Sequence, residues 1–234
     1  MKFSLSGSAA LLTAAVMLCS AYSCSNSSTD SSSKNNQASG NIPAGANVAE
    51  ADLPYGAKIT QLRPDTDEHI KIHTEFDNRY FERTEDGTYP SVYAVHDYIY
   101  AINERDVDIM KEAFYPPLLE KYSKDDGHEN IQDYIDSYCD SIKEVLHEDF
   151  TFDYIIIDSC DVADPDNLDD DFKELDAELE AVSPGITAKI TDRRIVDLDL
   201  YYNVNGQNEK SYTNHSGDSL MLYEYQIDGK YYIV

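Results

Sequence analysis

The main hydrophobic period of the region from Ser91 onward changes near His147. Before this point, apolar residues recur every three or four positions, which is the spacing of one face of an amphipathic helix. After it, apolar and polar residues alternate, which is typical of strands with one buried face. The helical positions include Val92, Val95, Ile99 and Ile102, and the alternating positions include Val196, Leu198, Leu200 and Tyr202. Helices that precede a run of strands predict an α+β domain, with the helices packed on an antiparallel sheet.

Local signals indicate where the elements begin and end. Asp106 follows the polar break Asn103–Arg105 and is expected to cap a second helix. A longer helix is predicted from Asn130 to His147, and an acidic helix inserted among the strands from Leu168 to Val182. Asp228-Gly229 predicts a two-residue hairpin turn. The inward residues of the longer helix are expected to be Ile131, Tyr134, Ile135, Tyr138, Ile142 and Val145.

The first part of the chain has the pattern of a targeting signal. Lys2 precedes an apolar run, Ala9–Leu18, which has signal-peptide length and is short for a membrane span. Small residues lead to Cys24, and the arrangement resembles a bacterial lipoprotein signal. The resemblance implies cleavage between Ser23 and Cys24, followed by lipid attachment at Cys24. Cys19 is the rival site, and ordinary secretion is the alternative. The two acyl chains that such a signal implies would anchor the protein stably in the membrane.

These signals divide the chain into segments. Residues 1–23 are expected to form the signal peptide, and residues 24–50 a disordered tether rich in Ser and Asn. Residues 51–234 are predicted to form a single α+β domain. Within it, residues 51–88 form a β-like N-terminal extension with strand-like stretches at Ala57–Leu62 and His69–Phe76, and residues 89–234 form the core.

The charge of the chain excludes one class of partner. The sequence has 18 Lys+Arg against 45 Asp+Glu, a formal net charge of −27. Such a surface repels phosphate backbones and anionic headgroups, so the protein is not expected to bind nucleic acid, and a lipid anchor is needed to hold it at a membrane. The acidity itself is interpreted as a solvated coat.

Two segments resemble the nuclear-transport-factor-2-like superfamily. The first is the helix–break–helix segment Val95–Asp108, with the sequence VHDYIYAINERDVD, and the second is the terminal hairpin Tyr223–Val234. The resemblance covers about residues 91–234, and it is nearest to small anchored lipoproteins of Gram-positive bacteria. It implies that the sheet curves around the first helix into a cone with a pocket. The pocket candidates are Tyr98, Val95, Ile102, Tyr223 and Tyr225.

The same resemblance bears on catalysis. Tyr98 matches the position of an oxyanion-stabilising tyrosine in ketosteroid isomerase. The isomerase also needs a carboxylate base, but the matching segment here is Tyr115–Leu119, with the sequence YPPLL. A hydrogen-bond donor alone cannot remove a proton, so Tyr98 is expected to be a core or pocket-wall residue, and no catalytic residue is assigned. The tyrosines of the last strands are either half-buried strand residues or part of a groove or interface, which leaves a homodimer open.

Other chemistry finds little support in the sequence. The acidic stretch from Asp158 to Glu180 fails the calcium-loop pattern and suits helix capping, so no metal site and no cofactor are assigned. His96 lies beside Asp97 and is expected to face solvent or line a rim. Cys139 and Cys160 either form a disulfide or are buried as free thiols.

Together these observations favour a lipid-anchored protein on the outer face of a bacterial cell membrane. Its domain is expected to bind an unknown small molecule, peptide or protein without catalysis. The alternative is an enzyme of the isomerase or cyclase kind that works in the same pocket. The acidic or basic groups that face Tyr98 would separate the two hypotheses.

Overall fold

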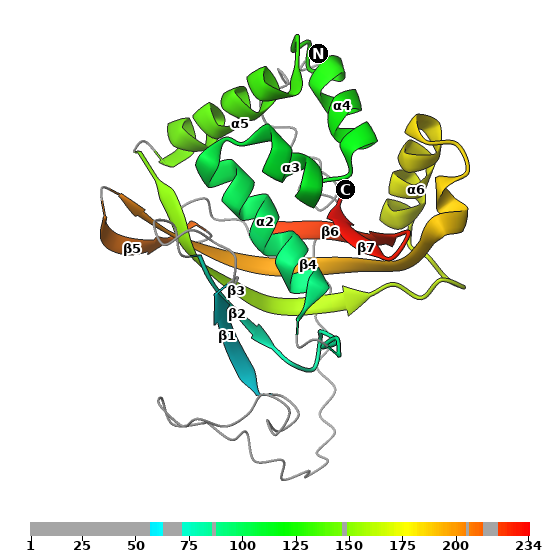
Figure 1. The fold of residues 1–234 in the computed structure, drawn as a ribbon, viewed down its shortest axis with the longest axis horizontal. Helices are drawn as coiled ribbons and strands as arrows, with labels where there is room; N and C mark the ends of the chain where they lie inside the picture. Colours follow the sequence, from blue (N-terminus) through cyan, green and yellow to red (C-terminus); the bar gives the residue numbers. More distant parts are fainter. Residues whose placement is uncertain (1–56, 63–71, 86–87, 147–148, 205, 213–219) are drawn as a thin grey trace, which may run out of the picture.

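A computed structural model describes residues 57–62, 72–85, 88–146, 149–204, 206–212 and 220–234 (Figure 1). The predicted signal peptide, Cys24 and the tether lie outside these residues. The described elements are β1 (Lys58–Leu62), β2 (His73–Asp77), α2 (Pro90–Glu104), α3 (Val107–Ala113), α4 (Pro116–Asp125), α5 (Ile131–Leu146), β3 (Thr151–Val162), α6 (Asp170–Val182), the 3-10 helix η3 (Ile186–Lys189), β4 (Ile190–Val204), β5 (Gln207–Ser211), β6 (Leu220–Ile227) and β7 (Lys230–Ile233). The predicted α+β class is confirmed. In the described part of the chain, no helix is long and apolar enough to cross a membrane.

The sheet has seven strands in the order β1-β2-β3-β4-β6-β7, with β5 paired to β4. All neighbouring strands are antiparallel except β2 and β3, which pair in parallel through His73–Glu75 and Tyr154–Ile156. The prediction of a wholly antiparallel sheet was therefore wrong. Helices α2 to α5 intervene between β2 and β3, and such a long crossover allows the chain to return in the same direction. The described strands form an open sheet and do not close into a barrel.

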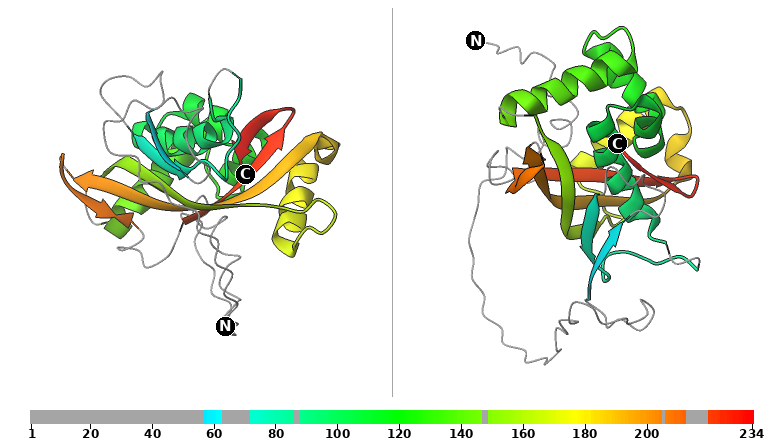
Figure 2. Two further views of the ribbon diagram at one scale, coloured as in Figure 1. Left: turned by 90° about the horizontal axis from the view of Figure 1, so that it is seen from below. Right: turned by 60° about the vertical axis from the view of Figure 1, so that its left-hand side comes forward.

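Helices cover the sheet on both sides (Figure 2). Alternate residues of β4 from Arg194 to Tyr202 are buried on the side of α2. The first three of them pair with Glu224, Leu222 and Leu220 of β6. Helix α6 lies against the opposite side, where the Phe172 ring contacts the rings of Tyr223 and Tyr225. The sheet is therefore a middle layer, and both faces of β6 are buried.

The helix–break–helix at the start of the core forms as the sequence predicts. Pro90 occupies the first turn of α2, where its missing N–H is not needed. The helix ends at Arg105, which has a left-handed backbone with φ 53°. Asp106 then caps α3, and its side chain accepts hydrogen bonds from the backbone N–H groups of Asp108 and Ile109 at 2.8 and 3.0 Å. The predicted cap at Asp106 is confirmed.

The buried stripe of α5 departs from the prediction at both ends: Ile131 is only partly buried, and Leu146 takes the place of Val145. Cys139 also belongs to the stripe. Val145 was expected to point inward, but it is 45% exposed, whereas Leu146 is 2% exposed. A helix advances 3.6 residues per turn, so the stripe through Ile135, Cys139 and Ile142 continues to Leu146. The limits of α5 lie within one residue of the predicted range.

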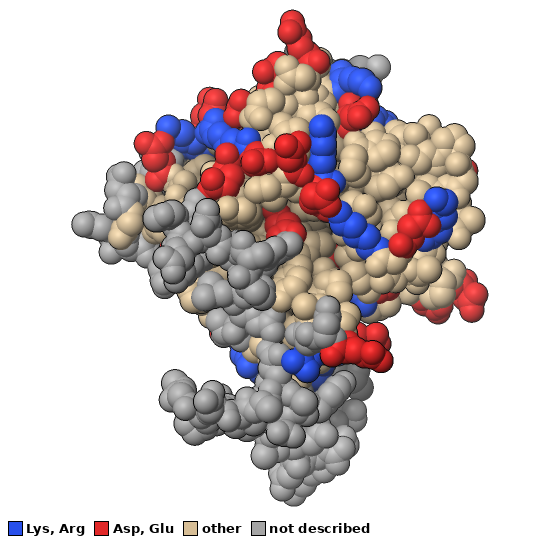
Figure 3. Space-filling model, viewed as in Figure 1, with Lys and Arg blue, Asp and Glu red and all other residues tan. Residues whose placement is uncertain are grey.

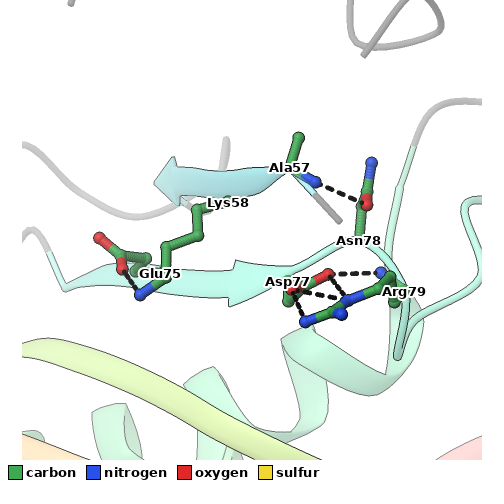
Figure 4. A network of polar contacts seen from close by, with 6 residues as sticks. All are labelled: Ala57, Lys58, Glu75, Asp77, Asn78 and Arg79. Carbon is green, nitrogen blue, oxygen red and sulfur yellow. Dashed lines mark hydrogen bonds and ion pairs between the residues drawn. The ribbon is translucent and has the colours of Figure 1, made fainter. Parts of the chain in front are cut away.

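The N-terminal extension joins the same sheet instead of forming a separate unit. Figure 4 shows how β1 is held against β2: the Lys58 ammonium group pairs with Glu75 at 2.8 Å. At the start of β1, the Ala57 backbone N–H donates to the Asn78 side chain at 3.1 Å, and Asp77 forms a two-point ion pair with Arg79 beyond β2. These contacts fix the turn that follows β2.

The last two strands close in the predicted tight turn. Asp228 and Gly229 both have positive φ, 52° and 82°. This conformation characterises the type I′ turn, whose twist matches that of the flanking strands. The predicted hairpin is confirmed. Cys139 and Cys160 are both free and buried, so the structure contains no disulfide between them.

Candidate functional site

The five residues proposed from the sequence to line one pocket lie on two faces of the sheet. Val95, Tyr98 and Ile102 lie on α2, and all three belong to the buried core. Tyr223 and Tyr225 are also buried, but their rings pack under α6 on the other side of the sheet. The structure brings the three α2 residues together and separates them from the two tyrosines.

The Tyr98 hydroxyl lies in an aromatic and sulfur-rich environment. Its ring is 6.2 Å from that of Phe114, and its hydroxyl interacts electrostatically with Tyr138, Cys139 and Tyr212. The Tyr98 and Tyr138 hydroxyls lie close enough to affect each other's pKa, but neither has a well-oriented hydrogen-bond partner among the described residues. Burial raises the pKa of both phenols above the ordinary value of 10, because desolvation disfavours the phenolate.

These surroundings do not supply a base for Tyr98. Among the described residues, no carboxyl group belongs to the set that interacts with its hydroxyl. In the segment where the resemblance would place a base, Leu118 and Leu119 are fully buried. In the described part of the chain, the position where the resemblance would place a base therefore holds apolar side chains, which cannot remove a proton.

His96 is placed differently from the prediction. It was expected to face solvent or line a rim, but it is 1% exposed, and its Nδ1 lies 3.2 Å from the Asp97 carboxylate. Helix α2 packs against β3, β7 and α3 and has buried residues over most of its circumference, so a position beside the apolar stripe is also covered.

A buried carboxyl group that the prediction did not include lies beneath the first turn of α2. Glu224 of β6 is 0% exposed and faces α2 together with Leu220 and Leu222. The Ser91 hydroxyl donates a short hydrogen bond to its Oε2. Its Oε1 is buried without a hydrogen-bond partner in the described structure. In the sequence, Glu224 falls at the same alternate positions as Leu220 and Leu222. This pattern could have indicated that the acid is buried.

Arg194 lies next to this carboxyl group but is paired elsewhere. Its Nε donates to the Asp192 carboxylate at 2.6 Å, and its Nη2 donates to the Tyr231 hydroxyl at 2.9 Å. The Tyr231 hydroxyl in turn donates to Asp192 at 3.0 Å. The Nη1 atom lies 3.4 Å from the Ser91 hydroxyl, so the guanidinium group reaches Glu224 only through Ser91.

Burial controls the protonation of this cluster. It raises the pKa of Glu224 to about 8, against opposing contributions from the Ser91 hydrogen bond and the Arg194 charge. It also raises the pKa of the Cys160 thiol, which lies near Arg194 and Glu224, to about 12. Glu224 and Cys160 are therefore neutral at pH 7, and both are buried.

An open cleft lies elsewhere, between the three helices that follow α2. It encloses about 390 Å³, which is within the usual range for ligand sites. The Gly127 backbone has φ 80° and turns the chain between α4 and α5, where Asn130 accepts a hydrogen bond from the Asp133 backbone at 2.9 Å. The cleft is lined by Val107, Lys111, Glu120, Ser123, Lys124, His128, Glu129, Asn130, Ile131 and Gln132.

The cleft carries both signs of charge. Lys124 and Glu120 form an ion pair at 3.5 Å, one helical turn apart on α4. Lys111 and Glu129 also line the cleft, and neither forms an ion pair within the described ranges. On the face shown in Figure 3, acidic and basic side chains are likewise interspersed over the helices, and an uncharged area extends over the side of α4 and α6.

The acidic residues around α6 act mainly as caps and ion-pair partners. Asp169 accepts a hydrogen bond from the Phe172 backbone at 3.0 Å, and Asp170 pairs with Lys173 at 3.0 Å. Asp171 accepts a hydrogen bond from the Tyr223 hydroxyl at 3.1 Å. In the regions that the structure describes, no three His, Cys, Asp or Glu side chains are grouped so that they could hold a metal ion.

Comparison of the chain with protein-family models, with curated proteins and with solved structures finds no match. The functional interpretation therefore depends on the geometry of the chain itself. Of its two polar features, the Glu224 carboxyl group is buried, and the cleft between α3, α4 and α5 is open to a ligand.

Proposed function

We propose that the protein is a lipid-anchored extracytoplasmic binding protein, and that the cleft between α3, α4 and α5 holds a small ligand. The observation that carries the proposal is the volume of the cleft, about 390 Å³, together with its mixed lining. Val107 and Ile131 offer an apolar contact, while Lys111 and Glu129 offer opposite charges that have no ion-pair partner in the described part of the chain. Such a combination of apolar walls with a few polar groups is typical of small-molecule sites.

The charges favour a ligand that carries both signs. A formal net charge of −27 creates a field that repels small anions from the protein. A zwitterion avoids this repulsion, because its positive group is attracted as its negative group is repelled. In the cleft, its anionic group would face Lys111 and its cationic group would face Glu129. A free amino acid or the end of a short peptide has this chemistry.

The anchor belongs to the same proposal. The segment before Cys24 resembles a lipoprotein signal, and the acidic domain has no electrostatic attraction to an anionic membrane. Cys24→Ala should move the protein from the detergent phase to the aqueous phase in a phase-partition experiment, whereas Cys19→Ala should leave it in the detergent phase. An unchanged partition of Cys24→Ala would favour ordinary secretion or an uncleaved anchor.

The nuclear-transport-factor-2-like fold is part of the proposal as well. The order of α2, α3 and the terminal β6–β7 hairpin supports it, as does the packing of α2 across the sheet. In this interpretation the sheet curves into a cone around α2. The interior that the superfamily uses as a pocket is occupied here by core residues such as Val95 and Tyr98. Ligand binding is therefore assigned to the outer helices, and the isomerase or cyclase alternative lacks a base at Tyr98.

Native mass spectrometry of the full chain tests the ligand site. We expect a mixture of amino acids and short peptides to yield bound adducts that disappear on unfolding. The double variant Lys111→Ala/Glu129→Ala should lose them, because it removes both charges from the cleft. Lys173→Ala/Glu174→Ala is the matched control on α6 and should keep them. Adducts that survive the cleft variant would show that the ligand binds elsewhere, and the absence of any adduct would contradict the proposed ligand class.

A further inference from the structure

Five polar residues, each from a different element, surround the buried end of Arg194. Ser91 comes from α2, Cys160 from β3, Asp192 from β4 itself, Glu224 from β6 and Tyr231 from β7. The titratable and charged groups that interact with Glu224 are Arg194, Asp192, Cys160 and Tyr231. The set contains two carboxyl groups and one guanidinium group, so a single positive charge faces two groups that can each become negative.

The two acids are buried to different degrees. The Asp192 side chain keeps 15% of its surface in contact with solvent, and it already holds the Arg194 Nε at 2.6 Å. Glu224 is completely buried, and its Oε1 has no partner in the described structure. A buried carboxylate without a counter-ion is strongly disfavoured, whereas a partly exposed one can be hydrated. Asp192 can therefore be partly hydrated when Arg194 leaves it, whereas an ionised Glu224 has no access to solvent.

We propose that Asp192 and Glu224 compete for Arg194, so that the protonation state of Glu224 decides which of the two carboxyl groups Arg194 pairs with. We call this two-state exchange under the first turn of α2 the latch. In the protonated state, Arg194 pairs with Asp192 and Tyr231, as the structure shows. In the ionised state, the Glu224 proton passes to solvent and the guanidinium group turns toward Glu224. The movement is short, because Nη1 already lies 3.4 Å from the hydroxyl of Ser91, which itself bonds to Glu224.

The exchange changes the contacts of two elements at once. Ser91 lies in the first turn of α2, and its hydroxyl bridges Arg194 and Glu224. Tyr231 lies in β7 and loses the Arg194 donor when the guanidinium group moves. The latch therefore links the protonation of one buried carboxyl group to the attachment of both the start of α2 and the last hairpin.

The burial of Glu224 raises its pKa to about 8, so the exchange is expected at mildly alkaline pH. NMR of the full chain between pH 6 and 10 can follow the Glu224 carboxyl carbon and the Arg194 Nε–H signal together. We expect both signals to move with one midpoint. In Glu224→Gln the Arg194 signal should stay at its low-pH position, because the amide does not ionise.

Removal of the competitor gives the sharper test. Asp192→Asn leaves Glu224 as the remaining acid near Arg194, so its midpoint should fall by about one pH unit or more. Asp176→Asn is the matched control, because Asp176 pairs with the neighbouring Arg193 at 2.7 Å on the other face. It should leave the Glu224 midpoint unchanged.

Three results would overturn the latch. The first is a Glu224 titration during which the Arg194 signal does not move. The second is an unchanged Glu224 midpoint in Asp192→Asn. The third is a carboxyl group that is ionised throughout the range. Should Asp192→Asn fail to fold, the comparison of the Arg194 signal in the unmodified chain and in Glu224→Gln still decides.

Discussion

Ser91 and Glu224 are joined by a hydrogen bond although they are 133 residues apart in the chain. Ser91 belongs to the first turn of α2, and Glu224 belongs to the strand β6 beneath it. The bond fixes the N-terminal end of α2 on the sheet and gives a buried carboxyl group its hydrogen-bond partner.

Loss of the Ser91 hydroxyl should destabilise the fold. Ser91→Ala leaves both oxygens of Glu224 without a partner, and an unsatisfied buried polar group costs about 1–3 kcal/mol. Urea denaturation should show this decrease in the free energy of unfolding. Ser141→Ala is the control, because the Ser141 hydroxyl bonds only to the Ser137 carbonyl within α5 and lies near the surface. Equal stability of the two variants would contradict the role of Ser91.

The stability of the protein should fall as the pH rises toward 8. Burial raises the pKa of Glu224 from 4.5 to about 8, so the folded chain keeps a proton that the unfolded chain has lost. The contribution is complete below pH 4.5 and decreases by about 1.4 kcal/mol per pH unit until the pH reaches the folded pKa. Urea denaturation at several pH values measures the slope.

Two variants isolate this group in the same experiment. Glu224→Gln should remove the contribution from the slope, because the amide does not titrate. Glu174→Gln, at an exposed position of α6, should retain the slope of the unmodified chain. A Glu224→Gln variant with an unchanged pH profile would mean that the carboxyl group is not responsible.

The phase of α5 can be tested with two adjacent residues. Leu146 is 2% exposed and Val145 is 45% exposed. Leu146→Ala should lower the free energy of unfolding by about 2–5 kcal/mol, because it removes buried methyl groups and leaves a cavity. Val145→Ala should change it by no more than about 0.5 kcal/mol. Thermal or urea denaturation distinguishes the two, and the reverse order would contradict the register of the helix.

The two buried cysteines should be unreactive while the chain is folded. Burial raises the pKa of the Cys139 thiol to about 11 and that of the Cys160 thiol to about 12, so at pH 8 neither forms the reactive thiolate. Iodoacetamide labelling followed by peptide mass spectrometry should leave both unmodified in buffer and modify both in urea. Val162→Cys is the control, because this position is 59% exposed and should be labelled in the folded protein.

The regular elements could be predicted because their signals are local. The Asp106 cap, the limits of α5 and the Asp228-Gly229 turn each depend on a few neighbouring residues, and the structure has all three. The error at Val145 arose from the helical period, because a position three residues along and a position four residues along fit the stripe almost equally well.

The assignment of faces could not be predicted in the same way. Tyr223 and Tyr225 alternate with Leu222 and Glu224, and α6 buries the second face of β6. Both faces therefore carry large buried side chains, and the sequence does not show which face turns toward α2. The parallel pairing of β2 with β3 depends on a crossover of four helices and leaves no local trace. The cleft likewise combines residues of three helices that become neighbours only after packing.

The parallel pairing of β2 with β3 has a consequence for the order of folding. The Tyr154 hydroxyl donates to Glu75 at 2.9 Å, and the two residues are 79 positions apart. The β1–β2 hairpin has no sheet to join until the helices and β3 have formed, and contacts between distant residues form slowly. We therefore expect the first strands of the chain to dock last, and to be the first part of the sheet to detach when the protein unfolds.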